Sequence, residues 1–153
     1  MNLEQEIKQT RPFRSEYQKL LINIQFTGSF LQTTFARMLK PYGLSPQQYN
    51  VLRILKGKHP QGYCNQEITA RMIDRSSNST RIADKLEEKK LITRNEHKSD
   101  RRQVDIRISR KGLELLEEIE TTLHAFRHKV KNFNEEKAKL MNEWLDELRN
   151  EQA

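Results

Sequence analysis

The sequence predicts a mainly α-helical fold with one small β-hairpin. Near both ends of the chain, apolar residues recur in alternating steps of four and three, which is the spacing of packed helices. Between them, two short segments alternate apolar and polar residues, as strands do, and flank a polar loop. The 153 residues have the size of one domain, and we expect a single domain over 1–153.

The first long helix is predicted over residues 12–40. Its apolar positions form a seam, which is typical of a helix that packs lengthwise against another helix. The segment Pro41-Tyr42-Gly43 is expected to end it, because proline and glycine favour the turn that follows a helix. The seam consists of Tyr17, Leu21, Ile24, Gly28, Leu31, Phe35 and Met38.

Capping signals mark the starts of the next two helices. Ser45 and Gln48 match a capping box. Pro46 stands at the first helical position, where the missing N–H leaves no hydrogen bond unmade. Asn65 is expected to cap a short third helix.

The fourth helix is predicted over about residues 76–89, with Ile82 and Leu86 on its inner side. At about 100° per residue, the opposite side carries small, polar and basic side chains. These outward residues are Ser77, Thr80, Arg81 and Asp84.

Residues 91–97 and 104–110 are the two predicted strands. The loop between them, residues 97–103, contains three basic residues besides a histidine and no apolar one. Ser109 follows and is expected to cap the fifth helix.

The fifth and sixth helices also carry apolar seams. Two long helical ends beside a small lobe leave apolar area that a second copy of the chain would cover, although packing within one chain would also use part of each seam. The seam residues are Gly112, Leu116, Ile119, Leu123, Phe126 and Val130, followed by Met141, Trp144, Leu145 and Leu148.

The net charge of +7 is unevenly distributed along the chain. Residues 71–111 carry +6 and residues 112–153 carry −4. A basic segment beside an acidic one favours a polyanionic partner such as nucleic acid. A solvated surface of mixed charge is the alternative, since residues 1–70 carry +5.

Several classes of protein are disfavoured. The single cysteine, Cys64, cannot form an internal disulfide, which fits a reducing compartment. No apolar run approaches the roughly 18 residues of a membrane span, and the N-terminus lacks the features of a signal peptide, so we expect a cytoplasmic protein without a membrane partner. No Gly-rich phosphate loop, HExxH motif or nucleophile signature is present, so we expect neither an enzyme nor a cofactor.

The third and fourth helices predict a helix-turn-helix. The major groove of DNA is about 12 Å wide and admits one helix, whose first residues meet the base edges. Small side chains would let the helix enter deeply, while basic side chains reach guanine or phosphate. The expected DNA-binding residues here are Arg75, Ser76, Ser77, Asn78, Ser79, Thr80, Arg81 and Lys85.

Residues 65–112 resemble the winged helix-turn-helix of the MarR family. The family pattern has Leu-Glu-x-x-Gly-Leu-Ile-x-Arg, then a wing with Asp-x-Arg, then Leu-Thr-x-x-Gly. Here these read LEEKKLITR (86–94), DRR (100–102) and ISRKG (108–112). With LSPQQYNVLRIL (44–55) and the terminal helices, the resemblance covers nearly the whole chain. Lys90 replaces the usual glycine, so a left-handed turn there would be strained or the turn has another shape, whereas Ser109 in place of threonine keeps the cap.

The resemblance implies a DNA-binding winged helix-turn-helix lobe over 44–110 and dimerisation helices over 12–40 and 111–152. It implies a homodimer that binds double-stranded DNA at a pseudo-palindromic operator and acts as a ligand-responsive repressor. In the wing, Arg102 would enter the minor groove, Asp100 would help to hold the wing, and Arg101 would add a basic residue to the tip.

The resemblance also implies a small aromatic or anionic effector between the dimerisation helices and the DNA-binding lobe. The candidate lining residues are Phe35, Met38, Tyr49 and Leu52, for which ordinary core packing is the alternative. Family peroxide sensors carry a cysteine early in the first helix, and residues 12–40 contain none. His124 and His128 have a spacing able to bind zinc, but no further ligand can be named, so no metal site is assigned.

Two kinds of DNA-binding protein fit these patterns. A sequence-specific regulator that reads bases predicts at least about 10³-fold discrimination between duplexes. A non-specific architectural protein predicts similar affinity for all of them.

Overall fold

The structure is a computed structural model, and it describes residues 2–96, 104–130 and 134–150. It confirms the mainly helical fold with one two-stranded antiparallel hairpin. Along the chain the elements are α1 (Leu3–Glu6), α2 (Glu16–Leu39), the 3-10 helix η1 (Lys40–Tyr42), α3 (Pro46–Lys56), α4 (Asn65–Arg71), α5 (Ser79–Glu88), β1 (Ile92–Glu96), β2 (Val104–Ile108), α6 (Arg110–Val130) and α7 (Glu135–Asn150).

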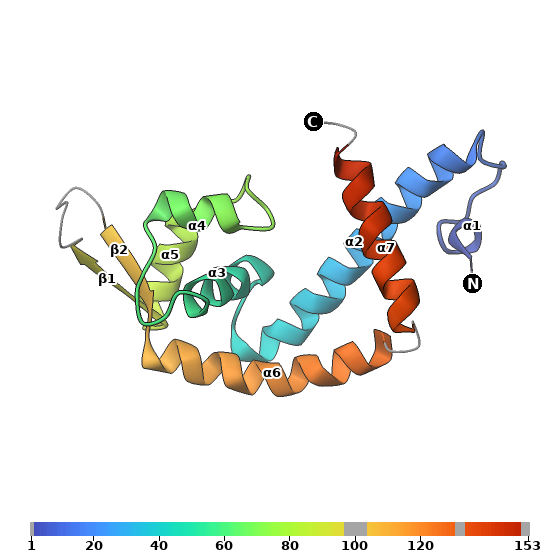
Figure 1. Cartoon of the computed structure of the whole chain (residues 1–153). Coiled ribbons are helices and arrows are strands. Elements are labelled where there is room, and N and C mark those ends of the chain that lie inside the picture. The colour runs from blue at the N-terminus through green and yellow to red at the C-terminus, as the bar shows by residue number, and fades with distance from the viewer. Residues whose placement is uncertain (1, 97–103, 131–133, 151–153) are drawn as a thin grey trace.

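The elements are arranged in two regions that α6 connects (Figure 1). Helices α3, α4 and α5 and the hairpin form one lobe. Helices α1 and α7 and the N-terminal part of α2 lie on the other side, and α6 runs along the base of both. A hydrogen bond of 2.5 Å between Tyr42 Oη and Thr122 Oγ1 joins the end of the α2–η1 segment to α6.

The predicted caps form where the sequence placed them, with one exception. The N–H of Gln48 donates to Ser45 Oγ at 3.2 Å and the N–H of Ser45 donates to Gln48 Oε1 at 3.1 Å, which completes the capping box of α3. The Gly112 N–H donates to Ser109 Oγ at 3.0 Å at the start of α6. At α4, however, Asn65 is the first helical residue and Cys64 precedes it, so the prediction that Asn65 caps this helix is wrong.

The hairpin is fixed to the lobe through the segment before α4. Strand β1 pairs with β2 in a register that places Arg94 opposite Ile106. Tyr63 forms an isolated bridge to Ile106, with both backbone N–H···O distances at 3.0 Å. A Cβ atom at Gly62 would lie 2.5 Å from the Ile106 carbonyl oxygen, so this close approach requires glycine.

The hydrophobic core lies within the lobe of α3, α4, α5 and the hairpin and extends onto α6 and the C-terminal end of α2. Its members come from α2, α3, α4, α5, the hairpin and α6. The seam of α6 is part of this core, because Leu116, Ile119 and Leu123 are at most 5 % exposed in the single chain. The fully buried large side chains are Leu39, Val51, Leu52, Leu55, Ile68, Leu86, Ile92, Leu116 and Ile119.

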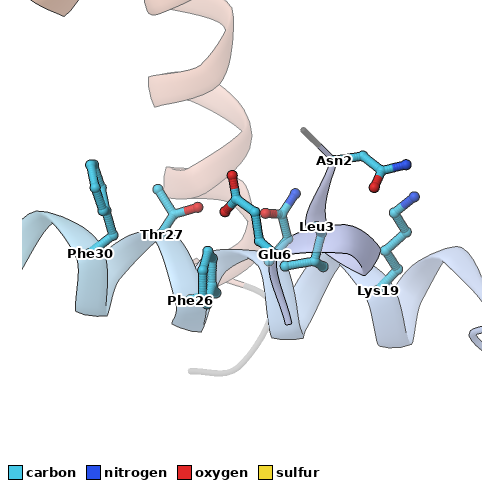
Figure 2. A pocket seen from close by; sticks show the side chains of 8 residues that line it. Asn2, Leu3, Glu6, Lys19, Phe26, Thr27 and Phe30 are labelled. Atoms are coloured by element: carbon cyan, nitrogen blue, oxygen red, sulfur yellow. The ribbon is translucent and has the colours of Figure 1, made fainter. Parts of the chain in front are cut away.

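A short helix, α1, was not predicted from the sequence. Its capping box is formed by Asn2 and Gln5, and Leu3 is buried against the rest of the chain. Glu4 Oε1 lies 2.6 Å from Lys19 Nζ of α2. A hollow of about 500 Å³ lies beside this contact, and Figure 2 shows its lining, with Glu6 and Leu3 of α1 near Phe26 of α2 and Phe30 farther along α2.

Candidate nucleic-acid interface

Helices α4 and α5 are joined by hydrogen bonds between their side chains. Thr69 Oγ1 lies 2.7 Å from Ser79 Oγ, and Asn65 Nδ2 donates to Thr80 Oγ1 at 2.9 Å. Ser79, which was predicted to bind DNA, is only 5 % exposed and lies on the inner side of α5, so its burial does not support that prediction. It lies on the same face as Ala83 and Leu86, four and seven residues later, and this spacing was visible in the sequence.

The turn between the two helices is organised by Asp74, a residue that sequence reasoning missed. Its Oδ1 accepts from the Ser76 N–H at 3.0 Å and from the Ser76 hydroxyl at 2.6 Å. Its Oδ2 accepts from the Ser77 hydroxyl at 2.7 Å. Hydrogen bonds from the hydroxyls of Ser76 and Ser77 hold the pKa of the Asp74 carboxyl below its ordinary value, so it is ionised at neutral pH.

The start of α5 is therefore later than predicted. Ser76 and Ser77 belong to the Asp74 turn, and Asn78 caps the helix by accepting the Arg81 N–H at 3.0 Å. Polar side chains that bond locally to the backbone compete with helix formation, which explains the shift from residue 76 to residue 79.

The outer surface of α5 is polar and basic. Thr80, Arg81 and Lys85 are exposed, as is Arg75 in the preceding turn, and Ser77 is half-buried. A groove of about 660 Å³ separates this surface from the start of α3. It is lined by Ser45, Gln47, Gln48, Ser77, Asn78, Arg81, Ile82, Lys85, Glu88 and Lys89.

The hairpin is held against α5 by Arg94 of β1. Its Nη2 lies 2.6 Å from Asp84 Oδ1 and 3.4 Å from the Thr80 carbonyl oxygen, and its Nη1 lies 3.2 Å from Glu87 Oε2. Sequence reasoning had placed Asp84 on the outer face and had given Arg94 no role. The position of Arg94 at the end of the LEEKKLITR motif was the feature of the sequence that could have indicated this role.

The tip of the wing lies outside the described residues. Asp100, Arg101 and Arg102 fall within residues 97–103, so their predicted contacts with the minor groove and with the rest of the wing stay predictions.

The turn after α5 takes the left-handed form despite its lysine. Lys90 has φ 60°, a conformation that favours glycine. Of the two alternatives, a strained left-handed turn and a turn of another shape, the left-handed turn is therefore correct. The Lys90 carbonyl oxygen accepts from the Ser109 hydroxyl at 2.8 Å, which connects this turn to the start of α6.

The four residues predicted to line an effector site pack as part of the core or against it. Leu52 is fully buried, Tyr49 is 9 % exposed, and Phe35 and Met38 pack against the core cluster. The rings of Phe35 and Tyr49 meet edge to face with centroids 5.3 Å apart. Their role in binding an effector stays a prediction.

Within the described ranges, no group of three His, Cys, Asp or Glu side chains is placed to hold a metal ion. The backbone of His128 is described as part of α6, but its side chain is outside what the structure describes. The helices that the structure describes include none that is both long enough and apolar enough to cross a membrane.

A two-helix unit with a rigid turn, followed by a hairpin bonded to its second helix, defines a winged helix-turn-helix protein. The sequence profile of the MarR family matches residues 44–104. The HTH-type transcriptional regulator MhqR of Bacillus subtilis (strain 168) is 32% identical over 101 residues, which are 66% of this chain and 68% of MhqR. The chain belongs to the MarR family.

Two further comparisons extend this likeness. The transcriptional repressor MprA of Escherichia coli (strain K12) is 30% identical over 94 residues, 61% of this chain and 53% of MprA, so the chain spans about half of that relative's length. The organohalide-sensing transcriptional regulator RdhR-CbdbA1625, in its 2,4-dichlorophenol-bound form, has a TM-score of 0.79 at 18% identity, covering 94% of this chain and 87% of the other. That structure shows that the fold extends over nearly the whole chain.

Proposed function

We propose that this protein is a sequence-specific regulator of transcription, acting as a repressor, that binds double-stranded DNA through its winged helix-turn-helix lobe over 44–110. The observation that carries this proposal is the α4–turn–α5 unit, whose outer surface presents small hydroxyls and exposed basic side chains beside a fixed hairpin. Membership in a family whose relatives are transcriptional regulators supports it.

The proposed docking follows from the shape and charge of α5. The start of a recognition helix meets base edges in the major groove, and here that start carries Ser77, Thr80 and Arg81. Lys85, one turn after Arg81, suits a backbone phosphate. Arg102 at the predicted wing tip would enter the minor groove.

Selection of bound fragments from a pool of random duplexes tests this function directly. Sequencing the fragments gives the operator, and fluorescence anisotropy then compares the operator with a scrambled duplex. We expect at least about 10³-fold preference for the operator and a steep fall in affinity with salt. Equal affinity for both duplexes would instead establish a non-specific architectural DNA protein.

A homodimer is the second part of the proposal, and the apolar groove between α2 and α7 supports it. The groove has a volume of about 790 Å³ and is lined mostly by apolar side chains from these two helices, with Asn23, Thr27 and Glu147 as the polar members of the lining. Tyr17 is 82 % exposed and Trp144 is 64 % exposed in the single chain, which is costly for side chains of this size unless a partner covers them. The seam of α6 supports dimerisation less than predicted, because Leu116, Ile119 and Leu123 are already covered by the chain's own core.

Dimer symmetry makes a prediction about the operator. A two-fold dimer binds two half-sites about one helical turn apart, so the selected sequences should be pseudo-palindromic. Selected fragments with a single unrepeated half-site would contradict the dimer while leaving base recognition intact.

A small aromatic or anionic effector is the third part. The organohalide-sensing regulator with this fold binds 2,4-dichlorophenol. An effector acts by binding more tightly to the form of the dimer whose lobes are wrongly spaced for the operator. Phenols and aromatic carboxylates added to the anisotropy assay should include compounds that release operator DNA, and the effect should disappear on substitution at Phe35 or Tyr49 if these line the site.

A further inference from the structure

The Thr80 hydroxyl, on the outer surface of α5, accepts one hydrogen bond from within the protein and keeps its own hydrogen. Thr80 Oγ1 lies 2.9 Å from Asn65 Nδ2, and an amide nitrogen only donates. The Thr80 oxygen therefore accepts this bond and keeps its own hydrogen for another acceptor. In the part of the chain that the structure describes, no acceptor takes that hydrogen, and the Thr80 side chain is exposed.

The Ser77 hydroxyl has the opposite polarity. It lies 2.7 Å from Asp74 Oδ2, and an ionised carboxylate only accepts, so Ser77 donates inward. Its oxygen lone pairs are left for a donor outside the protein. Asp74 orients Ser76 in the same way, at 2.6 Å through Oδ1.

We propose that Asn65 and Asp74 are positioning residues for base recognition, with Asn65 presenting Thr80 as a donor and Asp74 presenting Ser77 as an acceptor. This inference rests on the proposed function and concerns how the same surface reads DNA. In the major groove the acceptors are purine N7, guanine O6 and thymine O4, and the donors are the amino groups of adenine and cytosine. The available hydrogen of Thr80 then favours an acceptor edge, whereas Ser77, which has only lone pairs left, selects a base with an amino group.

The main chain of Thr80 is also held in place. Its carbonyl oxygen lies 3.4 Å from Arg94 Nη2 on β1, and the Asn78 cap bonds the next residue, Arg81. The Thr80 hydroxyl is therefore preorganised and loses little conformational freedom when it binds DNA. It cannot easily rotate to form a hydrogen bond with a mismatched base. A contact that served only to join α4 to α5 would affect stability but would not discriminate between bases.

The first experiment locates the base that Thr80 reads. Each base pair of the selected operator is substituted in turn, and each purine is replaced by its 7-deaza analogue, which lacks the N7 acceptor. We expect one position per half-site where the wild-type protein discriminates about threefold to tenfold, the effect of one hydrogen bond. Thr80→Val, which keeps the shape and removes the hydroxyl, should lose discrimination at that position only, and Thr80→Ser should retain it.

The second experiment reverses the polarity with Asn65→Asp. The new carboxylate accepts the Thr80 hydrogen and turns the lone pairs of Thr80 outward, so the preference at that position should move to a base with an amino group. The added charge weakens binding to every duplex, so the ratio of affinities is the readout. Asn50→Asp is the matched control, because Asn50 Oδ1 accepts from the Ile73 N–H at 3.0 Å and aspartate keeps that bond while adding the same charge.

The outcomes separate this inference from the proposed function. A Thr80→Val variant that discriminates at every position as the wild type does would overturn the inference and leave the proposed function intact. So would an Asn65→Asp variant that melts cooperatively and keeps the wild-type preference. If Asn65→Asp does not fold, the contrast between Thr80→Val and Thr80→Ser decides. A wild-type protein with no sequence preference removes the proposed function, and this inference with it.

Discussion

Arg94 of β1 and Asp84 of α5 are joined by an ion pair, with Nη2 and Oδ1 2.6 Å apart. The same guanidinium reaches Glu87, so one side chain holds two carboxylates about one helical turn apart. Because arginine presents its donors in a rigid fork, this contact fixes the direction of the hairpin relative to the helix. The reach of the wing along DNA depends on that direction.

Replacing Arg94 with methionine should weaken binding to the selected operator by about tenfold or more. The hairpin would lose its fixed direction, and Asp84 and Glu87 would be left as uncompensated anions near DNA. The free energy of unfolding should fall by no more than about 1 kcal/mol, because the pair is partly exposed and screened by solvent. Anisotropy and urea denaturation measure the two quantities. Arg110→Met is the matched control, since Arg110 is bonded to Glu114 on its own helix, and an equal loss of affinity in both variants would contradict the role of Arg94.

Lys85→Ala and Arg81→Ala should weaken DNA binding in different ways. Loss of a phosphate contact at Lys85 should lower affinity for all duplexes and reduce the slope of log K against log salt by about 0.9. Loss of Arg81 should chiefly lower the preference for the operator over other sequences, because its fork suits a guanine edge. Titrations at several salt concentrations distinguish the two effects. Lys139→Ala on α7 removes the same charge far from α5, and a slope change of the same size there would show a general charge effect.

The sequence was sufficient where a short-range signal decides the structure. The Ser45 capping box and the Ser109 cap form as predicted, and both strands form, although β2 ends at Ile108 rather than at residue 110. It was insufficient where partners distant in sequence decide. The α6 seam has the spacing of an intermolecular helix contact, yet Ile119 is fully buried in the chain's own core, because periodicity does not say which chain supplies the partner.

In the candidate site, too, some features follow from short-range sequence signals and others depend on partners distant in the sequence. The outward residues Thr80 and Arg81 follow from the helical period, and the structure leaves both exposed. The role of Asp74 in the turn and that of Arg94 in holding the hairpin depend on side-chain geometry that the period does not contain. Local hydrogen bonding at Asp74 also moved the start of α5, since serine and aspartate stabilise turns in competition with helix.

Lys90→Gly should stabilise the protein by about 0.5–1 kcal/mol. Lys90 has φ 60°, where a Cβ atom is strained by roughly 1–2 kcal/mol, and the greater freedom of glycine in the unfolded chain offsets part of the gain. Equilibrium urea denaturation measures the change. Lys89→Gly is the contrasting variant and should destabilise, because Lys89 has φ −79°, where glycine offers no relief, and its ammonium group donates to the Gly43 carbonyl oxygen and to Gln48 Oε1. Destabilisation by both variants would show that the left-handed turn stores no strain at Lys90.

Trp144→Ser should shift the protein from dimer to monomer without unfolding it. Trp144 lines the apolar groove between α2 and α7 and is 64 % exposed in the single chain, so its loss removes contact with a partner and little of the core. Leu140→Ser is the matched control, because Leu140 lies on the same helix but does not line the groove. Leu123→Asp, by contrast, should unfold the chain, since Leu123 is 5 % exposed in the core and a carboxylate there would be buried without a partner. Sedimentation velocity and circular dichroism distinguish these outcomes. A fully dimeric Trp144→Ser protein, or a folded monomer from Leu123→Asp, would indicate that the α6 seam forms the dimer interface and that the α2–α7 groove does not.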